Sequence, residues 1–302
     1  MNDFFDARSV RGVVASVFLL AQFSRFVFAE GGGSEISIID YYGTSVVLDE
    51  PAESVVSLSP GITETLFALG YGQLLVGRSA YCDYPPEVAD IAVVGNIIEP
   101  NIEYIVALSP DIVIASTHFT REAFDKLMRV GLKVAVLMGQ ETFEGVYDGV
   151  IRPLAILLGD ALAGEKVISS MQATVAEAMK RVERFAVNPT VYYVVGFGEG
   201  GDWTAGGDTF IGEMIEMAGG ENIAADVHGW SFNLESLVKR DPDIIIIPPW
   251  AKGVFSITPL YSDLRAVRDG NIIVVDDSSI SRQGPRIAEA FAGLVDTIGA
   301  FH

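Results

Sequence analysis

Two glutamates stand at matching positions in two similar segments of the chain. Residues 101–114 align without gaps on residues 233–246, and seven of the fourteen pairs are identical. In each segment an asparagine is followed two positions later by a glutamate, Glu103 in the first and Glu235 in the second. Asparagine is a preferred N-cap, and an acid in the first turn is stabilised by about 0.3 to 1 kcal/mol through the helix dipole. Helix stabilisation is therefore one interpretation, and a pair of acids that docks onto a cationic partner is the other.

Large aromatic residues follow several short apolar runs. In open α/β sheets, ligands bind beyond the carboxyl ends of the strands. Aromatic rings there supply rigid contact area, about 150 to 250 Å² for each enclosed ring. With one arginine as the main fixed cation, they predict a pocket for a large, flat, mostly apolar ligand with a few anionic or amide groups at its edge. The alternative is that the rings fill the lobe interiors. The candidate ligand-binding residues are Tyr81, His118, Phe197, Trp203, Trp230 and Arg282.

The histidines and the single cysteine offer limited metal chemistry. His118 and His228 fall in predicted loops, one in each half of the chain, and a neutral imidazole can ligate a haem iron or a corrinoid cobalt. Surface histidines without a ligand are the competing interpretation. Two histidines without nearby carboxylates make a poor zinc or manganese site. We expect Cys82 to be a packed small side chain rather than a nucleophile, and we predict no catalytic residue, no metal site and no intrinsic cofactor.

One glycine-rich run bears on an enzymatic alternative. Residues 196–201 match the dinucleotide-binding fingerprint, which requires a helix that opens at the glycines. Residues 202–207 instead continue as loop. The sequence also lacks HExxH, P-loop and GxSxG motifs. We therefore predict that the protein is not an enzyme, with an exported oxidoreductase or hydrolase as the less favoured alternative.

The elements that must position these residues follow one plan twice. Runs rich in Val and Ile are typical of strands buried on both faces of a mostly parallel sheet. We predict an α/β fold with two Rossmann-like lobes and a ligand cleft between them. The predicted strands are 54–58, 112–115, 133–137, 190–195, 244–247 and 272–275, and the predicted helices are 62–69, 121–130 and 209–218.

A longer helical pattern separates the two copies. Asp160 is a suitable N-cap, apolar residues recur at helical spacing as far as Phe185, and Asn188-Pro189 stops the pattern. About 25 residues of helix would extend roughly 40 Å, enough to cross both lobes, so we expect small hinge motions. The predicted parts are a signal peptide (1–29), an N-terminal lobe (36–148), a connecting region with the long helix (149–188) and a C-terminal lobe (189–302).

The first 29 residues have the pattern of an export signal. Arg8 and Arg11 precede an apolar stretch, and residues 27–29 are small or apolar, as a signal peptidase requires; a buried N-terminal helix is the alternative. The chain has 40 acidic and 20 basic residues, and its net charge of -20 argues against nucleic acid and anionic membranes as partners. Because Cys82 is the only cysteine, no disulfide can form within the chain, and we expect a periplasmic protein without a lipid anchor.

Several motifs together resemble the helical-backbone (class III) periplasmic substrate-binding proteins of ABC importers, in particular the members that bind vitamin B12. The resemblance covers nearly all of the chain after the export signal. The motifs that carry it are 56–64, 79–86, 101–103 with Pro110-Asp111, 203–206, 219–223 and 282–286.

The resemblance implies a monomer that captures a small-molecule ligand between its lobes and delivers it to a permease dimer in the inner membrane. Glu103 and Glu235 would then dock onto permease arginines. The implied transported ligand is a metal-containing corrinoid, with haem, a ferric siderophore or a metal ion as alternatives. Tyr81, Phe197, Trp203 and Arg282 occupy ligand-contact positions of the vitamin B12-binding members. Ser278 is a departure, since those members have an aspartate four residues before the arginine, and this leaves the ligand open among these classes.

Overall fold

Two parallel four-stranded sheets form the centres of two lobes in the computed structural model, which describes residues 36–301. The predicted signal peptide lies outside the described residues. The sheets have the orders β4-β3-β5-β6 and β9-β7-β11-β12, so in each sheet the second strand along the chain is at one edge, followed by the first, third and fourth. The prediction of a two-lobed, mostly parallel α/β fold is confirmed. The strands are β3 (Val55–Ser57), β4 (Leu75–Arg78), β5 (Ile112–Ala115), β6 (Val134–Val136), β7 (Thr190–Tyr193), β9 (Glu221–Asn222), β11 (Ile244–Ile247) and β12 (Ile272–Val274).

The central strands β5 and β11 are apolar along their whole length because both of their faces are covered. Ile112 and Ile114 belong to a hydrophobic core that extends through both lobes, whereas Val113 and Ala115 belong to a smaller cluster on the other face of the first sheet. Strand β11 alternates in the same way between the shared core and a separate cluster of the second lobe. Alternation of side chains along a strand produces this division.

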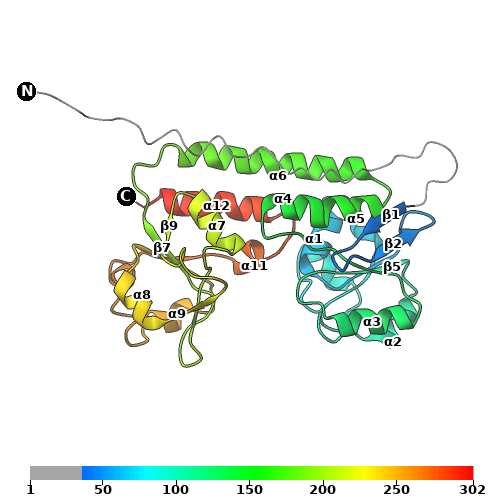
Figure 1. Ribbon diagram of the computed structural model, residues 1–302, viewed down its shortest axis with the longest axis horizontal. Helices are drawn as coiled ribbons and strands as arrows, with labels where there is room; N and C mark the ends of the chain where they lie inside the picture. Colours follow the sequence, from blue (N-terminus) through cyan, green and yellow to red (C-terminus); the bar gives the residue numbers. More distant parts are fainter. Residues whose placement is uncertain (1–35, 302) are drawn as a thin grey trace, which may run out of the picture. The chain divides into compact units, whose positions relative to one another are not determined.

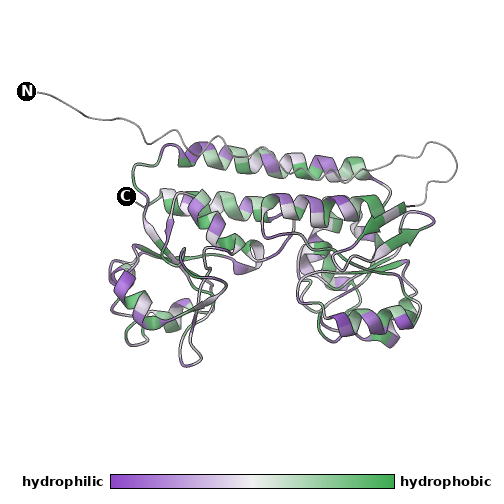
Figure 2. Cartoon of the chain, in the orientation of Figure 1, coloured by the Kyte–Doolittle hydropathy of each residue, from purple (hydrophilic) through white to green (hydrophobic). Residues whose placement is uncertain are grey.

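The shared core is closed by a layer of helices on one side of both sheets. The long helix α6 (Ala161–Val182) packs along α12 (Ile287–Gly299) and α5 (Arg152–Leu157), as Figure 1 shows. Figure 2 shows hydrophilic and hydrophobic residues mixed along α6, as expected for a helix with one buried face. The helices α1 (Pro60–Ala68), α4 (Phe143–Val146) and α7 (Phe210–Met217), with a π-helical turn at Tyr147–Ile151, complete this layer.

Helix α6 begins where the sequence indicates and ends earlier. The Asp160 carboxylate accepts a hydrogen bond from the Ala163 amide at 2.9 Å, which confirms the predicted N-cap. The last helical residue is Val182, several residues before Asn188-Pro189. Three residues later, Phe185 packs against the shared core beside Gly299, where an added Cβ would lie 2.4 Å from the ring.

The helices on the opposite face of each sheet repeat the same caps. Asn101 caps α2 (Ile102–Leu108), and Asn233 caps α8 (Leu234–Arg240), each through its side-chain oxygen. Both helices end in a left-handed residue, Ser109 and Asp241. The remaining helices are α3 (Arg121–Arg129), α9 (Lys252–Phe255), α10 (Arg265–Arg268) and α11 (Asp277–Ile280), with 3-10 turns at Gly72–Leu74 and Pro86–Asp90.

The repeated Pro-Asp dipeptide fastens the third strand of each sheet to the first. The Asp111 carboxylate accepts hydrogen bonds from the Ser54 amide at 2.8 Å and from the Ser54 hydroxyl at 2.9 Å. Asp243 accepts equivalent bonds from the Thr190 amide and hydroxyl, at 2.9 and 2.7 Å. We call this arrangement the Asp clamp, and it explains why the aspartate recurs in both copies.

Two antiparallel ribbons are added to this framework. One joins β1 (Ile36–Ile39) to β2 (Ser45–Leu48), and the other joins β8 (Asp202–Trp203) to β10 (Ser231–Phe232). Across residues 36–301, none of the helices combines the length and the apolar character that crossing a bilayer would require.

Candidate functional site

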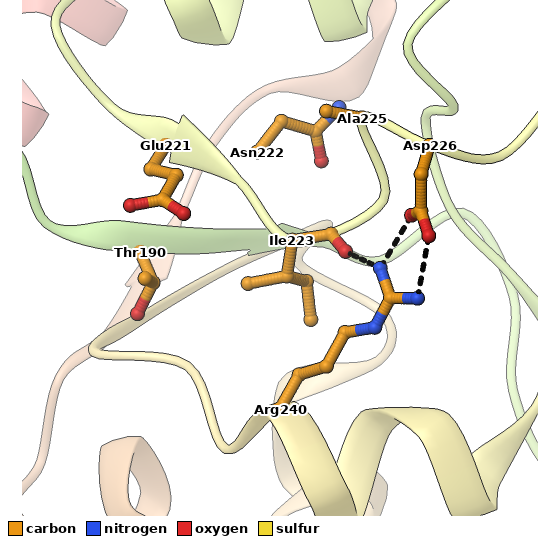
Figure 3. Close-up of a pocket in the computed structure, with 7 residues that line it drawn as sticks. All are labelled: Thr190, Glu221, Asn222, Ile223, Ala225, Asp226 and Arg240. Carbon is orange, nitrogen blue, oxygen red and sulfur yellow. Dashed lines mark hydrogen bonds and ion pairs between the residues drawn. The ribbon is translucent and has the colours of Figure 1, made fainter.

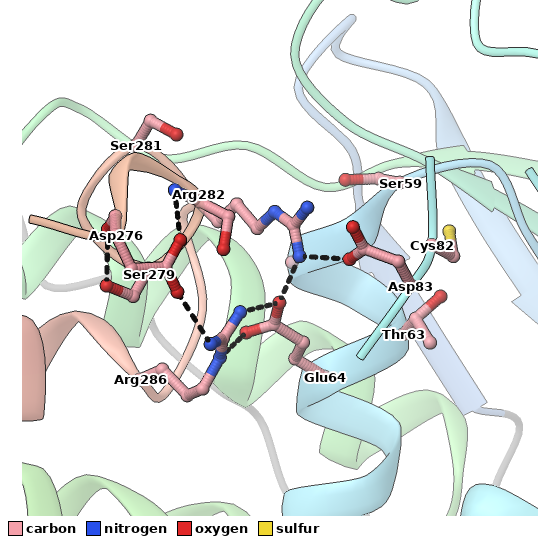
Figure 4. A network of polar contacts seen from close by, with 12 residues as sticks. Ser59, Thr63, Glu64, Cys82, Asp83, Asp276, Ser279, Ser281, Arg282 and Arg286 are labelled. Carbon is pink, nitrogen blue, oxygen red and sulfur yellow. Dashed lines mark hydrogen bonds and ion pairs between the residues drawn. The ribbon is translucent and has the colours of Figure 1, made fainter. Parts of the chain in front are cut away.

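A buried carboxylate from the first lobe binds two arginines from the second. Glu64 lies on α1 with only 2% of its side chain exposed. The guanidinium of Arg286 donates two hydrogen bonds to it, at 2.7 and 2.8 Å, and Arg282 Nη1 donates a third at 2.9 Å. A buried carboxylate is tolerated when it is paired with an opposite charge and hydrogen-bonded. Figure 4 shows how these side chains converge from the two lobes.

Two further carboxylates surround this pair of arginines. Arg282 Nη1 also donates to Asp83 at 2.7 Å, and Asp276 lies 3.9 Å from Arg286. The hydrogen bond from Arg282 lowers the pKa of Asp83 below its usual value. Burial alone would lower the pKa of Arg282, but the bonds to Asp83 and Glu64 raise it. These shifts keep both Asp83 and Arg282 in their charged forms at neutral pH. We call Glu64, Asp83, Asp276, Arg282 and Arg286 the interlobe ion network.

The backbone around this network is also in close contact across the lobes. Gly61 on α1 leaves room for the carbonyl of Gln283, which would lie 2.4 Å from an added Cβ. The Gly139 amide donates to the Gln283 side chain at 3.3 Å, and Glu141 accepts a hydrogen bond from the Phe210 amide at 3.1 Å. The lobes therefore meet through the loops that follow their strands.

Phe197 belongs to an aromatic cluster within the second lobe. Its ring lies nearly parallel to that of Trp250, at 6.1 Å between centroids and 9° between planes. It meets Phe255 and Tyr261 edge to face at 5.0 and 5.4 Å. Phe197 therefore combines a packing role with a half-exposed position, and Trp250 remains 60% exposed above it.

A buried polar group holds the glycine loop beneath these rings. The Tyr261 hydroxyl donates to Asp202 at 2.6 Å and accepts from the Gly198 amide at 3.2 Å. Burial raises the pKa of Asp202 above its usual value, and burial together with the bond to Asp202 raises the pKa of Tyr261 to about 12. Gly198 has φ +108°, a left-handed conformation that favours glycine at this turn.

Trp203 lies in β8, and Trp230 directly precedes β10. Trp203 pairs with Ser231, and the Thr204 amide donates to the carbonyl of Trp230. Both rings are more than one-third exposed, so the ribbon brings two partly exposed indoles to adjacent positions of its two chains.

The remaining candidates from the first lobe lie in its loops. Tyr81 is 58% exposed and sits two residues before Asp83 of the interlobe ion network. His118 is exposed in the loop after β5 with φ +66°. His228 is almost fully exposed in the other lobe, with Nδ1 3.4 Å from Asp208. Within residues 36–301, no three His, Cys, Asp or Glu side chains are grouped so that they could hold a metal ion.

Glu103 and Glu235 are both exposed in the first turns of α2 and α8. Neither forms an ion pair with another residue of the described part of the chain. Each helix packs on the sheet face opposite to α6 and α12, through Ile105 in α2 and Leu237 in α8. The two copies therefore present an unpaired acid at the same place.

The hollow in Figure 3 lies in the second lobe, at the amino ends of the strands of its sheet. It measures about 380 Å³ and is lined by residues at the start of β7 and β9 and the end of α8. Arg240 fills its polar side and binds Asp226 through two hydrogen bonds, at 2.6 and 3.0 Å. This hollow is at the amino ends of the strands, away from the edge where open α/β sheets bind ligands.

Two weaker sequence signals have structural explanations. The glycine run 196–201 leads into β8, and the next helix, α7, begins only at Phe210, so the run lacks the helix that a dinucleotide site requires. Cys82 is fully buried, and burial raises the pKa of its thiol, as expected for a packed side chain.

Sequence reasoning missed Glu64 as the shared partner of Arg282 and Arg286. The available signals were a single carboxylate in the otherwise uncharged stretch from Ile62 to Leu69, and two arginines spaced by four residues. It also missed Asp83 and the group formed by Asp202 and Tyr261. Pairings between segments so far apart in the sequence have no local pattern.

The chain is similar to known proteins in both sequence and fold. The family described as "Periplasmic binding protein" matches residues 55–278. The chain belongs to this family. A cobalamin-binding protein of Halobacterium salinarum is 30% identical over 279 residues, and the match covers 87% of this chain and 73% of that protein. A Bacillus subtilis protein, named an uncharacterized ABC transporter substrate-binding lipoprotein, is 28% identical over 273 residues. This second match covers 87% of this chain and 85% of that protein.

Solved structures agree with the assignment to the periplasmic binding protein family. The haem-binding protein RhuT of Roseiflexus in its apo form is 28% identical and has a TM-score of 0.74. The match covers 82% of this chain and 98% of the RhuT chain. These relatives are named for binding rather than for a reaction. The expectation of a substrate-binding protein, and not of an enzyme, is confirmed.

Proposed function

We propose that this periplasmic binding protein captures a corrinoid between its lobes and delivers it to the permease of an ABC importer. The observation that carries the proposal is the 30% identity to a cobalamin-binding protein over 87% of this chain. The lobes, taken as 36–148 and 189–302 with 149–188 connecting them, meet through the loops at the carboxyl ends of their strands. These are the loops that bind ligands in open α/β sheets.

The exposed aromatics support a ligand of this kind. Tyr81, Trp203 and Trp230 keep 58%, 39% and 38% of their surfaces exposed. Rigid rings of this size provide contact area for a flat macrocycle at little entropic cost. We propose Tyr81, Phe197, Trp203, Trp230, Arg282 and His118 as ligand-binding residues.

Haem is the second candidate ligand. It is favoured by the similarity to the Roseiflexus haem-binding protein, at 28% identity, and by His118, whose imidazole is exposed beyond the end of β5. His118 and His228 are the residues that could ligate an iron or cobalt. The metal would in either case arrive with the transported ligand.

We propose Glu103 and Glu235 as docking residues for permease arginines, one from each lobe. Their matched, exposed and unpaired positions within the described residues support this role. We further propose that the protein acts as a monomer in the periplasm after export by its signal peptide, without a lipid anchor. The Bacillus relative is named a lipoprotein, so membrane fractionation of the native protein tests the last point: recovery in the membrane fraction would contradict it.

Ligand titrations test the proposed function. Cyanocobalamin, haemin and a ferric siderophore are distinguished by their visible bands, and calorimetry gives their affinities. We expect cyanocobalamin to bind most tightly and Trp203→Ala to weaken it at least tenfold, about 1.4 kcal/mol. The melting temperature should stay unchanged, since Trp203 bonds to the ribbon through its backbone. Tyr104→Ala, on the outer helix α2, is the matched control and should leave affinity unchanged. Failure of the wild-type protein to bind cyanocobalamin would contradict the proposal.

A further inference from the structure

Arg282 retains free donors although it bridges two carboxylates. A guanidinium carries five N–H donors, yet Glu64 and Asp83 both bind the same nitrogen, Nη1. Within residues 36–301, the Nε and Nη2 groups of Arg282 have no hydrogen-bond partner, and 15% of the side chain is exposed. Arg282 can therefore donate to a ligand acceptor while it remains fixed by Glu64.

The interlobe ion network around these donors has an excess of carboxylates. It contains three carboxylates and two guanidinium groups, which gives a formal net charge of one negative. Arg78 lies under the same loop as Asp83, where its guanidinium donates to the backbone carbonyls of Ser79, Cys82 and Val88. The free donors of Arg282 therefore lie directly beside the carboxylate of Asp83.

Asp83 is the exposed and separable member of this network. Its side chain is 65% exposed and is held by Arg282, whereas Glu64 is buried and bound by both arginines. Loss of the Asp83 charge would leave the Glu64–Arg282–Arg286 contact in place. It would also turn the network's net charge from one negative to neutral.

We infer that Asp83 determines ligand specificity, selecting a macrocycle edged with neutral amides over one edged with carboxylates. A neutral carbonyl oxygen accepts a hydrogen bond from Arg282 without opposing Asp83. A carboxylate at the same place meets a like charge that is already paired with the arginine, and like charges brought together oppose binding. The inference rests on the proposed function because it assumes that the ligand edge reaches Arg282.

Paired ligands with the same ring isolate this effect. Haemin and its bis-amide differ only in whether the two edge groups are charged carboxylates or neutral amides. We expect wild-type protein to bind the bis-amide about tenfold more tightly than haemin. Asp83→Asn should reduce this ratio to about twofold or less and leave cyanocobalamin affinity within about threefold. Glu87→Gln, the same change of charge on an exposed residue of the same loop, should preserve the ratio.

The possible outcomes separate the inference from the proposed function. Wild-type binding of cyanocobalamin together with an unchanged haemin to bis-amide ratio in Asp83→Asn would overturn the specificity role alone. Tighter binding of haemin than of its bis-amide by the wild-type protein would also overturn it. Lack of cyanocobalamin binding by the wild-type protein would overturn the proposed corrinoid function instead. Melting curves of both variants show whether a lost affinity reflects a lost fold.

Discussion

The two lobes share a framework and differ in the loops at the carboxyl ends of their strands. Strand order, Asn caps, first-turn glutamates and the Asp clamp recur in both. The similarity ends in the loops that follow the carboxyl ends of the strands. In the first lobe the chain passes from β5 through a short loop to α3, whereas in the second it leaves β11 and includes α9 before reaching α10.

The longer loop of the second lobe is also unusually apolar. Trp250, Val254, Ile257 and Leu260 are each more than half exposed, and the β8–β10 ribbon lies in the same lobe. The first lobe contributes Tyr81 and the carboxylates Glu64 and Asp83 instead. A duplicated scaffold thus keeps its stabilising contacts in both copies, while the loops beyond its strands are rich in aromatic residues in one lobe and carry these carboxylates in the other. Loops are where such divergence is tolerated.

Removing the Glu64 carboxylate, whose surroundings differ most between the lobes, should have the largest effect on the free energy of unfolding. Glu64 and Glu213 occupy equivalent helices, α1 and α7, but Glu64 is buried against two arginines and Glu213 is exposed. We expect Glu64→Gln to lower the free energy of unfolding by about 3 kcal/mol, and Glu213→Gln to change it by less than about 0.5 kcal/mol. Urea unfolding measures both.

The sign of the Glu213 effect can be checked by pH. Although Glu213 is exposed, partial desolvation by the surrounding chain and the nearby Glu144 raise its pKa, so ionisation of Glu213 costs stability as pH rises through its folded pKa. Glu213→Gln should therefore be neutral or slightly stabilising at pH 7. Equal losses for the two variants would show that the lobes do not differ at this position.

The Asp clamps should give intermediate and equal effects. We expect Asp111→Asn and Asp243→Asn each to cost about 1 to 2 kcal/mol, since each removes a charged acceptor of backbone and hydroxyl donors. The sites lie in different lobes, so the double variant should lose the sum. A double variant no less stable than either single one would contradict this.

The pH dependence of the clamps follows from their hydrogen bonds. Burial alone would raise the pKa of both Asp111 and Asp243, but the bonds from Ser54 with Glu53, and from Thr190, lower them. A carboxyl with a lowered folded pKa stabilises above its unfolded pKa of about 3.9. That stability is lost as pH falls through the folded pKa. Wild type should therefore approach the double variant in stability below about pH 4, as measured by urea unfolding.

The paired docking acids should have the smallest effect on stability. We expect Glu103→Gln and Glu235→Gln each to lower the free energy of unfolding by at most about 1 kcal/mol. Corrinoid uptake by cells carrying the permease should nevertheless fall more than tenfold for the double variant, with unchanged ligand affinity, and wild-type docking should weaken with salt. Glu221→Gln, an exposed acid elsewhere on the second lobe, is the control. Normal uptake by the double variant would contradict the proposed docking role of Glu103 and Glu235.

Local patterns predicted the framework well because it is built from local chemistry. The apolar runs of β5 and β11 are correct to the residue, and the caps Asn101, Asn233 and Asp160 follow from short-range hydrogen bonding. Strands β4 and β9 were not predicted. Leu75–Arg78 contains a glycine and a charge, and Glu221–Asn222 has two polar residues, so neither has the apolar pattern of a buried strand.

The candidate site was less predictable because its contacts join distant segments. Arg282 was expected to be the main fixed cation for a ligand, yet Glu64 and Asp83, about two hundred positions away, already bind it. The ligand roles of the candidate residues remain predictions. Which face of the ribbon holds Trp203 or Trp230 depends on a register that no local pattern specifies.

The position of α12 has a consequence for how the chain acquires its structure. The last helix, Ile287–Gly299, packs on α6, and its Phe291 meets Phe143 edge to face at 5.6 Å. The core common to both lobes therefore stays open until the final residues of the chain are available. During synthesis, a chain that lacks this helix has no complete core to bury, so it should stay largely unfolded until the helix has been made. Protease resistance of chains released before and after residue 287 would reveal this dependence.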